Sequence, residues 1–344
     1  MKKTYHILAI RLSAMGDVAM AATVLRIFVH QNPDVKITFL SRAFLQPLFS
    51  DIPNVTFYVV DTKKKHKGIF GIYKLYKELK NLEFDAIADL HNVVRSKLLR
   101  NFFFGLKSVK IDKGRAEKKA LTSFPKNDFK QLKTSHERYA DVFRKLGFQI
   151  DLSKPVFPKQ KDLSKEIIRI SGEKKQGEKW IGIAPFAQYE TKMYPLDLME
   201  EVIQKLSKTE SIKLFLFGGG KEEEVILSDI ESKYKNTISV AGKLKLAQEL
   251  SLISNLDCML AMDSGNAHFG AMLGVNTITL WGNTHPFAGF APFYQPQENC
   301  ILPDLEKYPK IPTSVYGNKK IEGYKDVMKT ISPVKVVEKI LENI

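Results

Sequence analysis

The first half of the chain alternates short apolar runs with segments of helical periodicity. The run HILAIR is expected to be a strand and 18–31 a helix. The alternation continues through KITFLS, VTFYVV, FDAIADL and SVKID, with helices expected over 43–50, over 68–82 and at VVRSKLLRNFF. A helix at TSHERYADVFRKLGF, ended by Gly147, closes this half. Strands that alternate with helices indicate a parallel sheet covered on both faces.

A second alternation of the same kind begins at KWIGIAPF. Further strands are expected at KLFLFGG, TISVAG, LDCMLAMD and TITLWG, and helices over 195–208, 221–234, 246–255 and 266–273. The segment 287–331 is rich in Pro, Gly and aromatic residues and is expected to be irregular. In the final stretch, SPVKVVEKILENI, Ser332 and Pro333 are typical of the start of an amphipathic helix.

The two alternations predict two domains, which a chain of 344 residues can accommodate. Residues 151–178 hold two prolines and many charges and are therefore expected to contain the junction. The predicted domains are 1–160 and 175–331, followed by a C-terminal helix over 332–344. Two doubly wound α/β domains that face each other form a cleft, and ligands bind at the carboxyl ends of their strands.

The charge of the chain is +15 and unevenly distributed. Residues 61–133 carry 19 Lys and Arg against 8 Asp and Glu, including the runs KKKHK, RSKLLR and KGRAEKK. A charge run can simply be a solvated face. Such a bias also suggests an anionic partner, which could be a phosphorylated lipid, an acidic sugar, a nucleic acid or a membrane surface.

Several classes of protein and of site are not indicated. No apolar run is long enough to span a bilayer, and MKKTYHILAI lacks the cleavage site of a signal peptide. Cys258 and Cys300 lack metal-binding spacing and fit a reducing compartment. The sequence contains no P-loop, H-E-x-x-H or G-x-S-x-G motif, and its seven histidines are scattered. Neither a metal nor a cofactor is therefore expected.

The stretch RLSAMGDVAMA places Asp17 where the first strand passes into the first helix. A carboxylate in the first turn of a helix is favoured by the helix dipole and by free backbone N–H groups. Asp17 alone therefore has a plain structural explanation as well as a chemical one.

The segment LDCMLAMDSGNAHFGAMLGVNTITLWGNTHP is the most informative. Asp263 ends a buried strand, and Ser264, Gly265 and Asn266 form a tight turn before a helix. Small residues let backbone N–H groups approach a ligand, and a helix N-terminus attracts anions. We expect a phosphate group here, with His268 as a donor. The alternative is a capping aspartate beside a half-buried histidine.

Two further loops follow predicted strands. Lys192 stands in APFAQYETKMYP and would suit a diphosphate as counterion, although alone it would be an ordinary surface lysine. Glu222 follows the glycines of LFLFGGGKEEE, where an acidic residue can bind ribose hydroxyls or simply begin a helix. The glycines lack the full dinucleotide-binding context.

Three motifs in this order, RLSAMGDV, TKMYP and DSGNAHFGAMLGVNTITLWGNTHP, resemble those of glycosyltransferase family 9. This is the family of ADP-heptose:lipopolysaccharide heptosyltransferases, which have the GT-B fold of two Rossmann-like domains. The resemblance extends from Ile7 to the last helix. DLHNVVRSKLL and ISPVKVVEKIL match further family patterns.

The resemblance implies that Asp17 is the catalytic base and that the second domain binds the nucleotide sugar. Lys192 would contact the diphosphate, Glu222 the ribose and Leu244 the adenine. The residues implied to hold the diphosphate and the sugar are Asp263, Ser264, Gly265 and His268.

The chain departs from the family pattern in three places. Ser264 stands where the family has Thr, Ala187-Gln188 where it often has two threonines, and Lys-Met-Tyr-Pro where it has Lys-x-Trp-Pro. These differences bear on the identity of the donor more than on the fold.

The resulting prediction is an inverting, metal-independent transferase that moves heptose from ADP-heptose to the inner core of lipopolysaccharide. Inversion requires a base for the acceptor hydroxyl. The acceptor would be an anionic glycolipid, contacted by Lys64, Lys65 and Arg95. The expected location is the cytoplasm, with peripheral contact at the inner membrane.

Three alternatives remain open from the sequence. The first is a transferase of the same fold that uses another nucleotide sugar. The second is a relative that binds nucleotide or glycan without turnover. The third is a basic nucleic-acid binder, although no module signature of that class is present and no nucleic-acid partner is expected.

Overall fold

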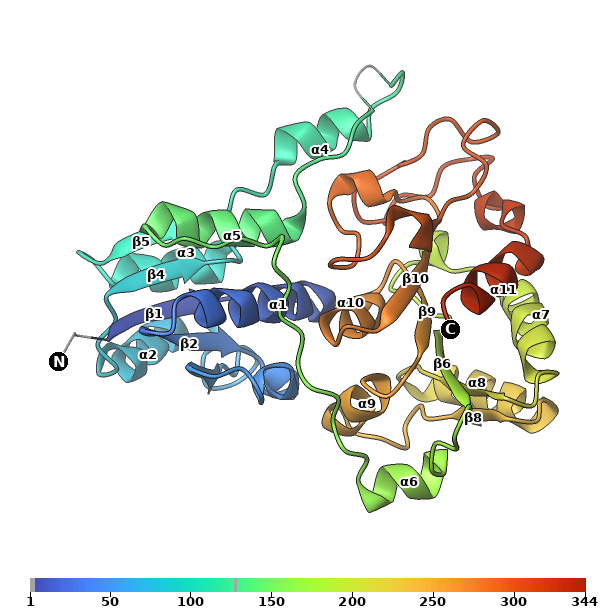
Figure 1. Cartoon of the computed structure of the whole chain (residues 1–344). Coiled ribbons are helices and arrows are strands. Elements are labelled where there is room, and N and C mark those ends of the chain that lie inside the picture. Colours follow the sequence, from blue (N-terminus) through green and yellow to red (C-terminus); the bar gives the residue numbers. More distant parts are fainter. Residues whose placement is uncertain (1–3, 127–128) are drawn as a thin grey trace. The chain divides into compact units, whose positions relative to one another are not determined.

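The computed structural model describes residues 4–126 and 129–344 of the chain (Figure 1). They divide into two compact units, each built on one parallel sheet. The first unit runs to Lys113 and resumes over Ser135–Pro158, and the second comprises the described part of Gly114–Thr134 together with Lys159–Ile344. Among the helices of residues 4–126 and 129–344, none combines the length and the apolar character that a membrane span requires.

The first unit contains five parallel strands in the order β3-β2-β1-β4-β5. The strands are β1 (Tyr5–Ile10), β2 (Val35–Ser41), β3 (Val55–Val59), β4 (Ala86–Asp89) and β5 (Lys107–Lys110). The helices are α1 (Met15–Gln31), η1 (Ala43–Phe49), α2 (Gly68–Lys80), α3 (Val94–Phe102) and α5 (Ser135–Leu146). Each predicted element is confirmed, with η1 as a 3₁₀ helix.

Helices cover both faces of this sheet (Figure 1). On one face, Leu75 of α2 and Leu99 of α3 pack with Leu8 and Ile10 of β1. On the other, α1 packs against α5, and the rings of Phe28 and Phe143 stack with their centroids 4.3 Å apart. The apolar runs predicted to be strands are therefore buried from both sides.

The second unit contains six parallel strands in the order β11-β10-β9-β6-β7-β8. The strands are β6 (Lys179–Ala184), β7 (Ile212–Leu216), β8 (Thr237–Ser239), β9 (Cys258–Met262), β10 (Asn276–Leu280) and β11 (Cys300–Ile301). The α-helices that were predicted are α7 (Leu196–Ser207), α8 (Lys221–Lys233), α9 (Leu246–Ile253), α10 (Gly265–Met272) and α11 (Pro333–Leu341). Short 3₁₀ helices lie at η2 (Glu190–Lys192), η3 (Pro286–Ala288), η4 (Gln297–Asn299) and η5 (Val327–Thr330).

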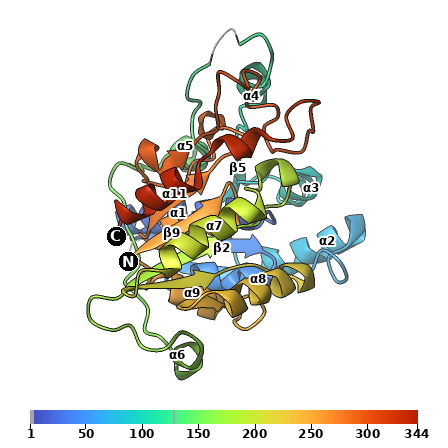
Figure 2. The ribbon, with the colours of Figure 1, turned by 90° about the vertical axis from the view of Figure 1, so that its right-hand side faces the viewer.

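The C-terminal helix α11 belongs to the second unit. Ser332 caps it as expected, accepting a hydrogen bond from the Val334 N–H at 3.2 Å. Its buried side chains, Val336 and Ile340, join the core of this unit. The helix lies against α7 in both views (Figure 1, Figure 2).

Two α-helices of the described residues were not predicted, α4 (Arg115–Leu121) and α6 (Lys165–Ser171). Both are short and lie in charged stretches whose apolar spacing is weak. The N-terminus of α6 is capped by Ser164, whose hydroxyl accepts a hydrogen bond from the Ile167 N–H. Short helices of this kind depend on such local contacts and on tertiary packing more than on a long apolar face.

The segment that contains α4 packs with the second unit, whereas the predicted first domain, 1–160, included it. Leu121 and Leu132 form a small apolar cluster with Ala288. The Leu132 N–H donates a hydrogen bond to the Phe287 carbonyl at 2.9 Å, and the Lys118 ammonium lies 4.0 Å from the centroid of the Phe290 ring. The chain therefore passes between the two units three times.

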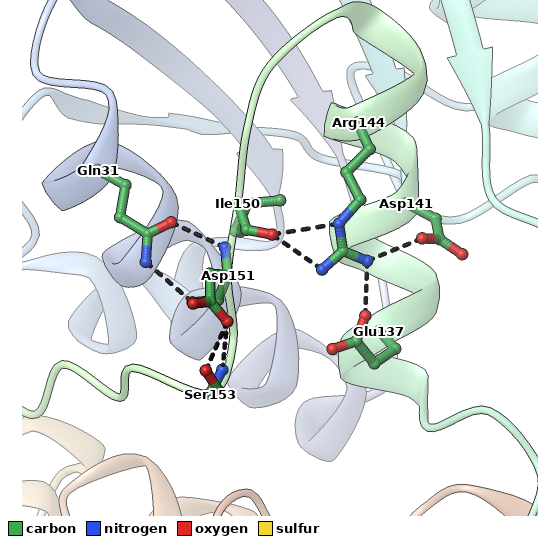
Figure 3. A network of polar contacts seen from close by, with 7 residues as sticks. All are labelled: Gln31, Glu137, Asp141, Arg144, Ile150, Asp151 and Ser153. Carbon is green, nitrogen blue, oxygen red and sulfur yellow. Dashed lines mark hydrogen bonds and ion pairs between the residues drawn. The ribbon is translucent and has the colours of Figure 1, made fainter.

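The segment that leaves the first unit is held by side chains of α1 and α5 (Figure 3). Arg144 donates two hydrogen bonds to the Ile150 carbonyl, at 3.1 and 2.9 Å, and pairs with Glu137 at 2.6 Å. Gln31 exchanges two hydrogen bonds with the backbone of Asp151, at 2.9 and 2.8 Å. These contacts fix the chain as far as Asp151.

Candidate functional site

Most of the candidate residues that the resemblance implied follow strand ends in the two sheets. In the second sheet, β6 is the first strand in sequence, and its neighbours are β7 on one side and β9 on the other. The connections therefore diverge between β6 and β9, and a crevice for ligands opens at such a switch point. Lys192 follows β6 and Asp263 follows β9, so both stand at this point.

Lys192 and Asp263 form an ion pair there. The Lys192 ammonium lies 2.9 Å from Oδ2 of Asp263, and the two side chains are 13% and 10% exposed. Thr284, which follows β10, donates a hydrogen bond to the same carboxylate oxygen at 2.9 Å. The ion pair and the threonine that donates to it thus follow three adjacent strands, β6, β9 and β10.

Helix α10 begins immediately after Asp263. Ser264 is its N-cap, and the backbone N–H groups of Gly265 and the following residues open the helix. The Ser264 hydroxyl is buried and makes no hydrogen bond to any described residue. His268 is buried one turn into the helix, at 8% exposure. The arrangement provides free N–H donors, a hydroxyl and a lysine side by side, which suits a phosphate group.

Loops nearby support the position of Lys192. The Thr191 hydroxyl donates to the Gly317 carbonyl, and a Cβ at Gly317 would lie 2.5 Å from Cδ of Lys192. The Asn283 N–H donates to the Thr191 carbonyl at 2.9 Å. These contacts were not predictable from the sequence, because Gly317 lies in the segment expected to be irregular and Asn283 had no role assigned within its motif.

Glu222 and Leu244 lie at the same edge of the second sheet, after β7 and β8 respectively. Glu222 is exposed in the first turn of α8. Its neighbour Glu223 accepts a hydrogen bond from the Gly219 N–H at 2.8 Å and supports the helix start. Leu244 is 9% exposed just before α9. Glu222 thus remains available for a ligand, while Glu223 has the structural role that was the alternative for Glu222.

Asp17 lies at the corresponding point of the first sheet, where β1 has β2 on one side and β4 on the other. Its Oδ2 lies 2.5 Å from a guanidinium nitrogen of Arg11 and accepts a hydrogen bond from the Ala14 N–H at 3.2 Å. The Tyr139 hydroxyl donates to Oδ1 at 3.4 Å. The side chain of Asp17 is 26% exposed and can therefore be reached from solvent.

Arg11 and His91 surround this carboxylate and had no role assigned from the sequence. Arg11 also donates a hydrogen bond to the Leu90 carbonyl at 2.9 Å, which joins the ends of β1 and β4. His91 accepts a hydrogen bond from the Leu12 N–H through Nδ1. Burial, together with the charge of Arg11, lowers the pKa of His91 to about 3, so its ring is neutral. The sequence feature that could have indicated a role for Arg11 is its position in the RLSAMGDV motif.

The three predicted acceptor contacts differ in their surroundings. Lys64 and Arg95 are exposed, on the turn before α2 and in the first turn of α3. Lys65 is half-exposed but pairs with Glu78 at 3.0 Å. Burial acts to raise the pKa of Glu78, but hydrogen bonds from Lys65 and from Tyr58 lower it below its usual value. Lys65 therefore has a structural partner.

The charge excess of residues 61–133 is divided between the units. Residues 61–113 carry 13 basic and 6 acidic side chains, and residues 114–134 carry 6 basic and 2 acidic. The second group belongs to a segment that packs with the second unit, so only part of the excess lies on the first. In the described ranges, no three His, Cys, Asp or Glu residues are grouped so that they could hold a metal ion.

Tyr194, one of the departures from the family pattern, is structural. It is 1% exposed, and its hydroxyl donates to the Ile331 carbonyl at 2.7 Å. Burial raises the pKa of Tyr194, so the hydroxyl remains protonated. The residue thereby ties the start of α7 to the segment before α11.

Comparison with known proteins places the chain in a family. The model of "Glycosyltransferase family 9 (heptosyltransferase)" matches residues 72–319. The lipopolysaccharide core heptosyltransferase OpsX of Haemophilus influenzae is 27% identical over 282 residues, covering 80% of this chain and 79% of that protein. Lipopolysaccharide heptosyltransferase 2 of Escherichia coli is 24% identical, covering 97% of both.

Solved structures share the fold. A family 9 glycosyltransferase from Veillonella parvula superposes with a TM-score of 0.77 at 19% identity, covering 99% of this chain and 98% of that one. The heptosyltransferase WaaC of E. coli, solved with ADP, gives a TM-score of 0.69 at 18% identity, covering 98% of this chain and all of that one. The two α/β units, each built on a sheet of parallel strands, thus have the GT-B fold expected from the sequence.

Proposed function

This chain belongs to glycosyltransferase family 9, and on that premise we propose that it transfers heptose from ADP-heptose to the inner core of lipopolysaccharide. The Lys192–Asp263 pair beside the start of α10 carries the proposal. The relatives support the choice of substrate, since they are named as lipopolysaccharide heptosyltransferases. WaaC, which shares the fold, was solved with ADP.

The second unit is the proposed donor-binding unit. Lys192, the Ser264 hydroxyl and the N–H groups at Gly265 would hold the diphosphate, with His268 beside them. Asp263 would keep Lys192 in place and contact the sugar. Glu222 would bind the ribose and Leu244 would contact the adenine. Negative charge grows on the diphosphate as it leaves, and fixed donors stabilise that charge most in the transition state.

Asp17 is the proposed general base. It would accept the proton of the acceptor hydroxyl while the oxygen forms a bond to the anomeric carbon of the heptose. The bond from that carbon to the phosphate oxygen breaks, and ADP leaves with the electron pair. Attack from the face opposite the leaving group inverts the anomeric configuration. Arg11 would orient the carboxylate through the ion pair of 2.5 Å.

The acceptor is proposed to be an anionic glycolipid. Lys64 and Arg95 are exposed on the unit that carries Asp17, which supports a role in binding its negative charges. Lys65 would contribute only after exchange of its pairing with Glu78. We place the enzyme in the cytoplasm, with peripheral contact at the inner membrane where such an acceptor is presented.

The Asp17→Asn variant tests the mechanism. The amide retains the size of the carboxylate but does not accept a proton, so kcat should fall by roughly 10²–10⁴ while ADP affinity stays unchanged. Asp34→Asn, on the exposed turn before β2, is the matched control. Near-normal turnover of Asp17→Asn would remove Asp17 from the role. An NMR spectrum of the product should show the anomeric configuration opposite to that of the donor.

The donor is tested by thermal shift with a set of nucleotide sugars. A ligand at 100 times its dissociation constant stabilises the folded state by about 2.7 kcal/mol, so the preferred sugar should stand out. If another nucleotide sugar raises the melting temperature more than ADP-heptose does, a transferase of different donor specificity is favoured. Binding without turnover on any acceptor would favour the non-catalytic alternative. Transfer should also proceed in EDTA, because no proposed step uses a divalent metal.

A further inference from the structure

The start of α2 combines exposed apolar side chains with lysines. Phe70 is 87% exposed, Ile69 55% and Tyr73 43%. They lie on the outward face of the helix, whose other face contributes Ile72, Leu75 and Leu79 to the core. The exposed lysines around them are Lys63, Lys64, Lys67, Lys74 and Lys77. We call this set of eight residues the α2 surface.

The positive charge of the α2 surface is largely uncompensated. Residues 61–80 contain seven lysines and two acidic residues. Glu78 is occupied by Lys65 and His66, and the Asp61 carboxylate accepts hydrogen bonds from the backbone N–H groups of Lys63 and Lys64 at 3.0 and 2.9 Å. In the part of the chain that is described, no ion pair joins the lysines of the α2 surface to a carboxylate. Their charges are thus available to an external anion.

The turn that carries the first lysines is rigidly held. His66 is 2% exposed, and its Nδ1 accepts a hydrogen bond from the Asp61 N–H at 3.1 Å. A Cβ at Gly71 would lie 2.4 Å from the carbonyl carbon of His66, so only glycine lets α2 approach the turn this closely. The lysines and Phe70 are therefore presented together by fixed backbone.

From these observations we propose that the α2 surface docks the enzyme on an anionic lipid bilayer, with Phe70 and Ile69 inserted among the lipids and the lysines on the headgroup phosphates. Exposed aromatic and aliphatic side chains flanked by lysines match the layered chemistry of a bilayer, apolar inside and negative at its surface. Lysine side chains can extend toward the phosphates while their methylene stems remain in the apolar region.

The position of this surface suits the proposed function, on which the inference rests. Helix α2 begins where β3 ends, and α1 with Asp17 begins where β1 ends. Since β1, β2 and β3 are parallel, both helix starts lie at the same edge of the sheet. A bilayer against the α2 surface would thus present a glycolipid at the edge that carries Asp17.

Vesicle sedimentation with the full chain tests the inference. Wild type should bind vesicles of phosphatidylcholine containing phosphatidylglycerol, and not phosphatidylcholine alone. The affinity should fall steeply with salt, since screening shortens to about 8 Å at physiological ionic strength. The Lys67→Gln/Lys74→Gln variant should bind roughly 25-fold more weakly at low salt, at about fivefold per lysine. The Phe70→Ser variant should bind about tenfold more weakly, through loss of apolar burial.

Matched controls come from the same unit. Phe104 is 99% exposed but follows α3, at the opposite edge of the sheet, so Phe104→Ser should bind as wild type. Lys36→Gln/Lys145→Gln removes two exposed charges outside the α2 surface and should have little effect. Phe70→Ser should keep the wild-type melting temperature, because the side chain contributes little to the core.

The inference fails if Phe70→Ser and Lys67→Gln/Lys74→Gln bind vesicles as wild type does. It also fails if the control variants lose as much vesicle affinity as these two variants. Salt-sensitive binding to single-stranded RNA without vesicle binding would instead assign the lysines to a nucleic acid. Transfer of heptose to a delipidated, water-soluble acceptor is measured in parallel. If wild type does not transfer heptose to this acceptor, the proposed function is contradicted. If Phe70→Ser transfers heptose to it as wild type does, the effect of the substitution is confined to docking.

Discussion

The guanidinium of Arg11 lies 2.5 Å from the carboxylate of Asp17 and also donates a hydrogen bond to the Leu90 carbonyl. One side chain thus connects the end of β1, the first turn of α1 and the end of β4. Each terminal nitrogen of the planar guanidinium makes one of these contacts, a geometry that the single nitrogen of a lysine does not reproduce.

Arg11→Lys should therefore lower kcat for transfer by roughly 10- to 100-fold, as the loss of a charge-assisted hydrogen bond of about 1.5–3 kcal/mol implies. The affinity for ADP should not change, because Arg11 lies in the first unit. Steady-state kinetics and calorimetry separate the two quantities. If the variant loses ADP affinity in proportion to kcat, Arg11 does not act through Asp17.

Lys192→Met should weaken ADP binding by roughly 10- to 100-fold, the range expected for loss of a charge-assisted contact to phosphate. Adenosine, which carries no phosphate, should bind to the variant as to wild type. Lys205→Met, on the exposed face of α7, is the control in calorimetry. Equal losses for ADP and adenosine would mean that Lys192 acts only through the fold.

Tyr194→Phe should lower the free energy of unfolding of the second unit without changing the affinity for ADP. The substitution removes the donor to the Ile331 carbonyl and leaves that buried group unpaired, at a cost of about 1–3 kcal/mol. Urea unfolding followed by circular dichroism measures the change. Tyr73→Phe, which removes the hydroxyl of an exposed tyrosine in the first unit, should be neutral. A wild-type midpoint for Tyr194→Phe would show that the carbonyl finds another partner.

Glu249 gives a pH-dependent prediction. Burial raises its pKa to about 7 in the folded state, above the ordinary value of 4.5. Between these two values the unfolded chain releases a proton that the folded chain keeps, so this group lowers stability as pH rises through that window. The free energy of unfolding of Glu249→Gln, relative to that of wild type, should thus increase by roughly 2–3 kcal/mol between pH 4.5 and pH 8. For Glu210→Gln, at an exposed position, the difference from wild type in the free energy of unfolding should not depend on pH. If the difference between Glu249→Gln and wild type is also independent of pH, the raised pKa of Glu249 is contradicted.

The sequence was sufficient for the sheets, because apolar runs between turn residues predict buried parallel strands. It was insufficient for α4. Leu121 and Leu132 are isolated apolar residues in a basic stretch, and their partner Ala288 lies more than 150 positions away in the chain. Nothing local indicates such a contact. The resemblance to a family selected Asp17 and Lys192 among many similar residues, whereas Tyr139 and Thr284 became visible only once the elements were placed in space.

The three passages of the chain between the units have a consequence for its integrity. A protease cut after Pro158 would sever the only direct connection from the first unit to β6. The N-terminal fragment would nevertheless retain α4 and Leu132, which are packed against residues 287–290 of the other fragment. The two fragments should therefore remain associated after cleavage through these packing contacts. The chain could thus be expressed as two polypeptides divided at this point and recovered as one complex.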